Sequence, residues 1–180
     1  MNTVETKIQL APGARMPEYA TPGASCMDCF AHLIKLHSVK GDYYGDNVKV
    51  TTIELHDNES LKNVSGRVDM VTIDPGFALE LPEDYAVKAY ANSRFAKAGW
   101  QLANCIGVID NDYRGHIKFI YVPGPHAKPF HEVFSIGGVC GQIEPCQRFR
   151  MQLNSVAGLT PTQRGEGGFG STQQKGAANA

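Results

Sequence analysis

Short apolar runs separated by turn residues dominate most of the chain. Met70 to Ile73 and Phe77 to Leu81 flank an Asp-Pro-Gly turn, and Tyr85 to Tyr90 follows a Pro-Glu-Asp turn. Apolar runs of this length, bounded by Pro, Gly and Asp, are typical of β-strands. The pattern therefore predicts three short strands, at 70–73, 77–81 and 85–90.

Further strands are predicted on both sides of this group. Residues 25–36 are mostly apolar around a single acid, Asp28, which favours one buried strand over an amphipathic helix. Residues 105–109 and 116–122 are apolar runs that flank the polar stretch 110–115, and this arrangement predicts a hairpin with an acidic tip. Residues 133–143 supply more strand.

One short helix is predicted from Ser93 to Gly99, with Ser93 as its N-cap and Gly99 as its stop. A hydroxyl and two cations, Arg94 and Lys97, lie in its first turns, which is a composition suited to anion binding. An ordinary capped surface helix explains the same residues. Many short strands and a single helix favour an all-β sandwich or barrel.

The segment 37–68 differs from its surroundings. Gly41-Asp42 and Gly45-Asp46-Asn47 are turn signals, residues 48–55 alternate partly between apolar and polar, and residues 56–59 are polar. We interpret the whole segment as a β-hairpin-like excursion on the surface.

Composition limits the function classes. The 180 residues suggest one domain with an extension, and 42% hydrophobic residues are enough for a core. Charged residues make up 19% and the net charge is −1, so no basic track for a nucleic-acid polymer is expected, and an acidic ligand should be small. Without a signal peptide or a span-length apolar stretch, we expect a soluble cytosolic protein. The odd number of cysteines, 5, favours free thiols in such a compartment.

From Thr160 onward the chain is rich in glycine and poor in core-type residues. We expect residues 1–160 to form a single β-domain and residues 161–180 a mobile tail. Within the tail, glycines would let backbone N–H groups approach phosphate oxygens, Arg164 can bind a phosphate, and Phe169 can stack on a nucleobase. A flexible tail with a stray aromatic residue is the alternative. A P-loop is excluded because no Gly-Lys-Ser/Thr follows.

The polar stretch 110–115 carries a second chemical signal. Asp110 directly follows an apolar run, where its carboxylate can serve as a general base toward water. A plain turn is the alternative, since Asp and Asn are common turn formers. A calcium loop is rejected because Tyr121 stands where a glutamate ligand is needed. Cys26 and Cys29 have no second pair of matching spacing, so a zinc site is not favoured.

Taken together and in order, these segments resemble the five sequence motifs of the trimeric dUTPase family, over residues 8–36 and 70–172. Residues 17–28 resemble the first motif, 93–97 the second and 140–142 the end of the fourth, while 107–115 match the third closely and 164–172 the fifth almost completely. The resemblance implies a jelly-roll-like β-domain that assembles as a homotrimer, with three subunits sharing each active site. It also implies hydrolysis of dUTP to dUMP and pyrophosphate with Mg²⁺.

The resemblance assigns roles to individual residues. Asp110 would activate the attacking water, Tyr113 would pack under the deoxyribose and reject a 2′-hydroxyl, and Asp28 would hold Mg²⁺ through water. Uracil would be read by Asn104, Gly107, Val108 and Lys118. The phosphates and the closing tail would involve Asn92, Ser93, Arg94, Gln142, Arg164, Phe169, Gly170 and Ser171.

The chain departs from the family pattern in three places. Asn92 stands where the second motif begins with Arg, and Arg94 would supply that charge. Cys140 and Gly141 precede Gln142 where the fourth motif carries Ala next to Gln and an Arg before that pair. The stretch between Asp28 and Gly76 is longer than usual, so 37–68 is interpreted as an insertion.

Two other functions are compatible with parts of this pattern. A dCTP deaminase, a relative with the same fold, needs a glutamate where this chain offers aspartates, and it lacks the glycine-rich tail. A regulatory module of another class would use the 37–68 insertion to recognise a partner protein, with the nucleotide as a switch. This second function could coexist with catalysis.

Overall fold

A computed structural model describes residues 3–40 and 49–167. The chain divides into two compact units, Met1–Phe149 and Arg150–Ala180. The strands and helices all lie in the first unit, and residues 150–167 contain no helix or strand. No helix in the described ranges is long and apolar enough to cross a membrane.

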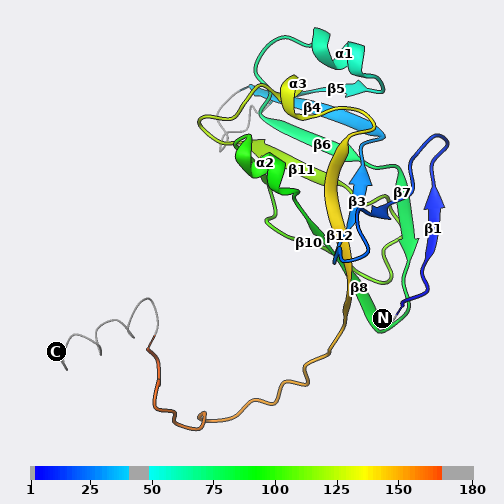
Figure 1. The fold of residues 1–180 in the computed structure, drawn as a ribbon. Coiled ribbons are helices and arrows are strands. Elements are labelled where there is room, and N and C mark those ends of the chain that lie inside the picture. The colour runs from blue at the N-terminus through cyan, green and yellow to red at the C-terminus, as the bar shows by residue number, and fades with distance from the viewer. Residues whose placement is uncertain (1–2, 41–48, 168–180) are drawn as a thin grey trace. The chain divides into compact units, whose positions relative to one another are not determined.

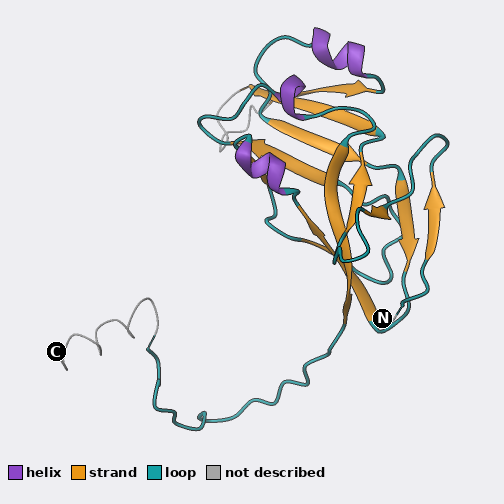
Figure 2. Cartoon of the chain, in the orientation of Figure 1, coloured by secondary structure: helices purple, strands orange, loops and turns teal. Residues whose placement is uncertain are grey.

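The first unit contains two five-stranded sheets and a two-stranded sheet (Figures 1 and 2). Sheet I has the order β10 (Gly107–Ile109), β8 (Tyr85–Tyr90), β12 (Val139–Gln147), β3 (Met27–Phe30) and β2 (Glu18–Tyr19). Sheet II has the order β5 (Lys49–Leu55), β4 (Leu33–Lys40), β6 (Met70–Asp74), β11 (Phe119–Pro123) and β9 (Trp100–Leu102). The small sheet pairs β1 (Lys7–Leu10) with β7 (Phe77–Glu80), and the helices are α1 (Asn58–Asn63), α2 (Ser93–Lys97) and α3 (Phe130–Val133). The predicted all-β class is confirmed.

Sheets I and II pack face to face through residues of β11 and β12. A Cβ atom at Gly141 would lie only 2.1 Å from the Phe119 ring, so the two strands touch where no side chain fits. The buried Tyr121 hydroxyl donates to the Cys140 carbonyl at 2.8 Å, and the Tyr121 ring lies 4.4 Å from that of Phe95. The core is therefore continuous from sheet II through β12 to α2.

The predicted single strand at 25–36 is wrong, because two strands occupy this segment. Residues 27–30 form β3 in sheet I, and β4 begins at Leu33 in sheet II. Between them, Ala31 donates its N–H to the Gly138 carbonyl at 2.9 Å, and the Gly137 N–H donates to the Ala31 carbonyl at 2.7 Å. The apolar run therefore crosses from one sheet to the other at this corner.

The strands predicted around the Asp-Pro-Gly turn and at 85–90 are confirmed as β6, β7 and β8. However, β6 and β7 belong to different sheets, so the turn is a corner between sheets and not a hairpin. Gly76 has a φ of 76°, and a Cβ there would lie 2.7 Å from Ala14 Cβ. A side chain would therefore be both strained and crowded at this corner.

The predicted hairpin with an acidic tip at 110–115 is also wrong. β10 pairs with β8 in sheet I, whereas β11 pairs with β6 and β9 in sheet II. The polar stretch therefore connects the two sheets. Apolar runs on both sides of a turn do not reveal which strands they pair with.

The helix prediction is correct in position and wrong in its cap. Asn92, not Ser93, is the N-cap of α2, and its side-chain oxygen accepts the Arg94 N–H at 3.1 Å. Gly99 follows the helix with a φ of 81°, as expected of a stop. Asn caps as well as Ser, so the cap could be assigned to either residue from the sequence.

The segment 37–68 contributes a hairpin, as predicted, but the hairpin begins earlier. β4 pairs with β5 from Ile34↔Leu55 to Lys40↔Lys49, and β4 is an interior strand of sheet II. The residues 41–48 that connect them lie outside the described ranges. α1 follows β5, with Asp57 as its N-cap.

Candidate active site

A polar row crosses the middle of sheet I. Asp28 of β3 pairs with Gln142 of β12, which pairs with Tyr90 of β8. The Gln142 side-chain amide donates to Asp28 Oδ1 at 2.8 Å. The second carboxylate oxygen of Asp28 has no hydrogen-bond donor among the described side chains, and Asp28 is half-buried. The first and fourth motifs, which are 114 residues apart, are thus joined by one hydrogen bond.

Glu144 extends this row by one more polar contact. The Tyr90 hydroxyl donates to Glu144 Oε1 at 2.5 Å, and the Cys26 thiol lies 4.0 Å from Glu144 Oε2. The hydrogen bond to Glu144 raises the pKa of Tyr90 to about 12. Tyr90 therefore keeps its proton even in moderately alkaline solution.

The residues of the second motif continue from the end of β8. Ser93 and Arg94 are exposed at the start of α2. Arg94 Nη2 donates to the Val139 carbonyl at 2.8 Å, and its guanidinium lies 4.7 Å from the centre of the Phe95 ring. Arg94 therefore stands beside the start of β12, in the same region as Gln142.

A second group of predicted site residues follows the edge strand β10. The turn before it holds Cys105 at a φ of 59°, and the Ile106 N–H donates to the Asn104 carbonyl at 2.6 Å. The Asn104 side-chain nitrogen would be 3.5 Å from a Cβ at Gly107, while Val108 is 62% exposed. The backbone of this edge strand and the Asn104 amide offer donors and acceptors of the kind that read a planar base.

Asp110 and Tyr113 lie at the other end of β10. The Tyr113 N–H donates to the Asp110 carbonyl at 3.2 Å, which closes a turn, and the Asp110 side chain is exposed. Arg114 Nη1 donates to the carbonyls of Asn111 at 2.6 Å and Tyr113 at 3.1 Å. The turn is therefore fixed from within, with the Asp110 carboxylate free to act on solvent.

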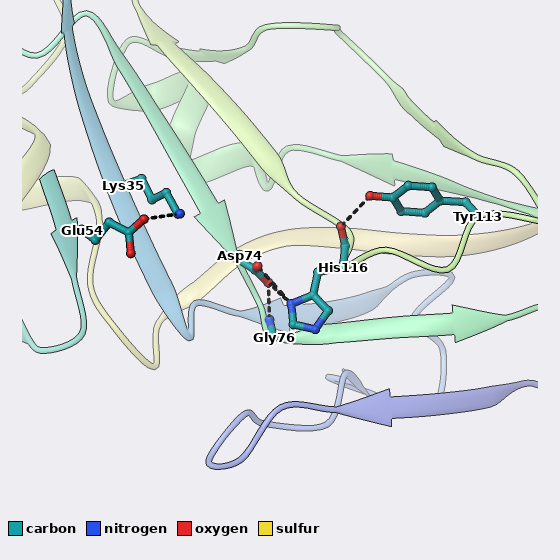
Figure 3. A network of polar contacts seen from close by, with 6 residues as sticks. All are labelled: Lys35, Glu54, Asp74, Gly76, Tyr113 and His116. Carbon is teal, nitrogen blue, oxygen red and sulfur yellow. Dashed lines mark hydrogen bonds and ion pairs between the residues drawn. The ribbon is translucent and has the colours of Figure 1, made fainter. Parts of the chain in front are cut away.

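The Tyr113 ring is held by the residues that follow it (Figure 3). Its hydroxyl donates to the His116 carbonyl at 3.2 Å, and a Cβ at Gly115 would lie 2.3 Å from that hydroxyl. His116 Nδ1 lies 3.0 and 3.1 Å from the two carboxylate oxygens of Asp74. The other pair in the figure, Lys35 with Glu54, joins β4 and β5 and is separate from these residues.

The two groups of site residues do not meet within one chain. By register, Asp28 is level with Tyr90, and Asp110, one residue past β10, is level with Ala86. This is an offset of four residues along the strands (90 − 86) and three strand spacings across the sheet. At about 3.3 Å per residue and 4.8 Å per strand, the two backbones lie roughly 20 Å apart. The two carboxylates of a single chain therefore belong to well-separated parts of sheet I.

Lys118, Arg164 and three residues of the tail complete the predicted set. Lys118 is exposed, one residue before β11. Arg164 belongs to the second unit, where its Nε donates to the Gly167 carbonyl at 2.7 Å. Phe169, Gly170 and Ser171 lie outside the described residues.

Sequence reasoning missed Tyr90, Glu144, Asp74 and His116. The sequence pattern places Asp74 in a turn and His116 at the start of an apolar run. Asp74 and His116 are 42 residues apart in the chain, and Tyr90 and Glu144 are 54 residues apart. No local pattern could have revealed these pairs.

The whole chain matches curated enzymes closely. A deoxyuridine 5′-triphosphate nucleotidohydrolase (dUTPase) from Desulfitobacterium hafniense is 32% identical over 177 residues, covering 96% of this chain and 98% of the relative. The chain belongs to the dUTPase family. A dUTPase from a Hydrogenobaculum species is 30% identical over 168 residues, covering 93% of this chain and 96% of the relative. No family model matches the chain.

Solved dUTPase structures share the fold. The dUTPase of Staphylococcus bacteriophage 80alpha, solved with dUpNHpp, has a TM-score of 0.63 at 16% identity and covers 94% of this chain and 99% of its own. The dUTPase of phage phi11 of S. aureus, described with a coordinated structural Mg(II) ion, has a TM-score of 0.59 at 14% identity, with coverages of 87% and 99%. The jelly-roll-like dUTPase fold predicted from the motifs is thereby confirmed.

Proposed function

We propose that the protein is a dUTP diphosphatase, which hydrolyses dUTP to dUMP and pyrophosphate with Mg²⁺ at sites shared between chains of a homotrimer. The observation that carries the proposal is the near full-length similarity to dUTP nucleotidohydrolases. The same proposal assigns the protein to the cytoplasm of a bacterial cell or of a virus-infected host cell, where dUTP arises.

Asp110 is the proposed general base. Its exposed carboxylate follows β10 and is held by the Asp110–Tyr113 turn. It accepts a proton from a water molecule that attacks the α-phosphorus, the bond from that phosphorus to the bridging oxygen breaks, and pyrophosphate leaves. A positioned general base contributes about 10²- to 10⁴-fold, so phosphate neutralisation and orientation supply the rest.

The nucleoside is proposed to bind along β10. Asn104, Gly107 and Val108 contact uracil from the turn and the start of the strand, with Lys118 nearby, and the Tyr113 ring packs under the deoxyribose. A ring in contact with C2′ leaves no room for the hydroxyl of UTP. The Asn104 side-chain amide beside Gly107, at the start of the exposed edge strand, supports this assignment.

The phosphate chain is proposed to bind to the second group of residues. Gln142, Asn92, Ser93 and Arg94 lie near one another around the start of β12 and α2, and the Arg94 guanidinium is exposed there. Arg164 holds the terminal phosphate when the tail closes. Phe169, Gly170 and Ser171 complete the closure, with the Phe169 ring over the base.

The donor set suits a magnesium ion that arrives with the substrate. No cluster of three or more His, Cys, Asp or Glu side chains that could hold a metal occurs in the described part of the chain. Mg²⁺ keeps several waters and binds through one or two carboxylates plus phosphates, so the single half-buried Asp28 fits water-mediated contact. The bound ion would neutralise phosphate charge, while Gln142 orients the Asp28 carboxylate.

The trimer is supported by two features of the chain. The separation of roughly 20 Å between the backbones of Asp28 and Asp110 supports sites that draw their two carboxylates from different chains. Phe149, Met151 and Leu153 are 84%, 85% and 84% exposed, and exposed apolar side chains this close together suit contact with another subunit. Closed cyclic symmetry is the usual form of such assemblies.

A second function, a nucleotide-switched protein-binding module, is favoured by one contact of the insertion. The Asn58 side chain of α1 donates to the Ile136 carbonyl at 3.2 Å and accepts the Ile136 N–H at 2.7 Å. Ile136 lies just before β12, which carries Gln142. Nucleotide bound at Gln142 would thus bias the insertion's position. This function predicts that deleting residues 37–68 changes at least one cellular effect of the protein. A deletion that leaves every such effect unchanged would contradict it.

Pyrophosphate release from dUTP, dCTP, dTTP and UTP, measured side by side with and without EDTA, tests the proposal. We expect rapid release from dUTP alone, abolished by EDTA. Ammonia release from dCTP would instead identify a deaminase. No turnover of dUTP with Mg²⁺ present would refute the proposed function.

A further inference from the structure

We propose that Asp74 and His116 form a positioning pair that fixes the Tyr113 ring and thereby sets the discrimination between deoxyribose and ribose. This inference rests on the proposed function, since Tyr113 is the group assigned to the sugar. Neither residue touches the nucleotide in that assignment. Both act through the backbone of the segment that carries Tyr113 (Figure 3).

Asp74 is an unusual anchor because it is charged and only 9% exposed. Its Oδ1 accepts the Gly76 N–H at 2.7 Å, and both oxygens lie within 3.1 Å of His116 Nδ1. An ionised carboxylate only accepts hydrogen bonds, so Nδ1 is the ring nitrogen that carries the proton. A carboxylate this deeply buried is costly without partners, and removing its His116 donor leaves it short of one.

His116 is joined to Tyr113 through its own carbonyl. That carbonyl accepts the Tyr113 hydroxyl at 3.2 Å. The next residue, Ile117, donates its N–H to the Phe77 carbonyl at 3.1 Å. The His116 side chain and the Ile117 N–H therefore hold this segment on the β6–β7 corner. The His116 carbonyl in turn orients the Tyr113 hydroxyl.

Tyr113 needs this support because packing alone does not hold it. Tyr113 is 45% exposed and lies on the segment that connects sheet I with sheet II. The ring also packs against Gly115, where a side chain would collide with it. Misplacement of a positioning group by about 1 Å can cost on the order of 10²-fold in rate. A loosened His116 would move the ring away from C2′ and admit UTP.

Two substitutions at one position separate this role from general stability. The amide nitrogen of Asn in His116→Asn lies at about the same distance along the side chain as Nδ1, whereas that of His116→Gln lies near the position of Nε2. We expect His116→Gln to lower the ratio of kcat/KM for dUTP over UTP by about tenfold or more. His116→Asn should keep most of the wild-type ratio. A purely structural defect would lower both kcat/KM values together.

Tyr113→Phe provides a second variant, because it removes the hydroxyl and keeps the ring. If the pair acts through that hydroxyl, the double variant with His116→Gln should lose no more discrimination than the worse single variant. Additive losses, or a wild-type ratio in His116→Gln, overturn the proposal.

The rate of amide hydrogen exchange in residues 110–118, measured without nucleotide, tests how firmly the segment is held independently of catalysis. Exchange should be faster in His116→Gln than in His116→Asn. If the wild-type protein does not hydrolyse dUTP but the exchange difference is present, the proposed function is refuted and the positioning pair is not. Equal exchange in the two variants refutes the positioning pair, whatever the activity.

Discussion

Phe119 of β11 occupies the space in which a side chain at Gly141 of β12 would lie. A Cβ at Gly141 would be 2.1 Å from Phe119 Cε1, closer than any real contact. Phe119 is fully buried, so its ring has no open space to move into. The contact therefore fixes the distance between the two sheets one residue before Gln142.

Gly141→Ala is expected to destabilise the protein and disturb Gln142, even though alanine is the residue that the family pattern has here. Overpacking a buried site costs about 1–3 kcal/mol. We expect a loss of that size in the free energy of unfolding, measured by urea denaturation. Adding Phe119→Leu should recover part of it, because the smaller side chain makes room.

Gly23→Ala is the matched control, since no atom lies within 4 Å of a Cβ there. It should leave stability nearly unchanged. If Gly141→Ala proves as harmless as Gly23→Ala, the sheets are not in contact at β12 as described.

Asp110→Asn should bind a non-hydrolysable dUTP analogue normally and lose about 10²- to 10⁴-fold in kcat. The amide keeps the shape of the side chain but is not a base. Asp112→Asn, in the same turn, is the control and should retain most of its turnover. Calorimetric binding and pyrophosphate release measure the two quantities. Near-normal turnover by Asp110→Asn would show that the base has been misassigned.

A chain that ends before Arg164 should fold and assemble while hydrolysis of dUTP collapses. The tail supplies the terminal phosphate contact and the closing ring, and neither belongs to the first unit. Removing only 173–180, beyond the fifth motif, should spare activity. Light scattering and turnover on both truncations test this, and full activity in the shorter chain would exclude a closing role for the tail.

Because two thiols are buried, we expect the free energy of unfolding to fall at alkaline pH. Burial raises the pKa of both Cys29 and Cys140. In the unfolded chain these thiols ionise near about 8.5, so the unfolded state gains free energy above that pH while the folded thiols stay protonated. Stability is therefore complete below about pH 8.5 and falls as the pH rises, by up to about 1.4 kcal/mol per pH unit for each thiol.

Urea denaturation at fixed chain concentration between about pH 7.5 and 10 measures this slope. The Cys29→Ala/Cys140→Ala variant should show a shallower decline, whereas Cys105→Ala, at an exposed position, should not differ from wild type. Parallel curves for all three proteins would mean that the buried thiols do not control the alkaline limit.

Local chemistry made several elements predictable. Tyr85–Tyr90 is bounded by a Pro-Glu-Asp turn and a capped helix, and its strand was found at the predicted residues. The five motifs led to the dUTPase family through their resemblance to it, and the similarity to curated dUTPases confirms that family. The hydrophobic pattern gave the strands but not their partners, since apolar side chains bury equally well against either sheet.

Long-range pairs account for what the sequence missed. The segment 110–118 was predicted to be a hairpin because its residues do not indicate that β10 pairs with β8 and β11 with β6. Asp74 and His116 are each ordinary in their own segments and become an anchor only when the β6–β7 corner approaches the crossing. Asn92 and Ser93 are equally good caps, so only the geometry decides between them.

The central claim is that the Asp110 of one chain and the Asp28 and Gln142 of another act on the same dUTP. Co-expressing Asp110→Asn chains with Asp28→Ala/Gln142→Ala chains, and purifying mixed oligomers through two tags, tests it directly. Each parent alone should be nearly inactive. Every mixed trimer has one site in three that draws both intact halves, so roughly one third of wild-type dUTP turnover should return in the doubly purified oligomers. A mixture no more active than the average of its parents would contradict the account.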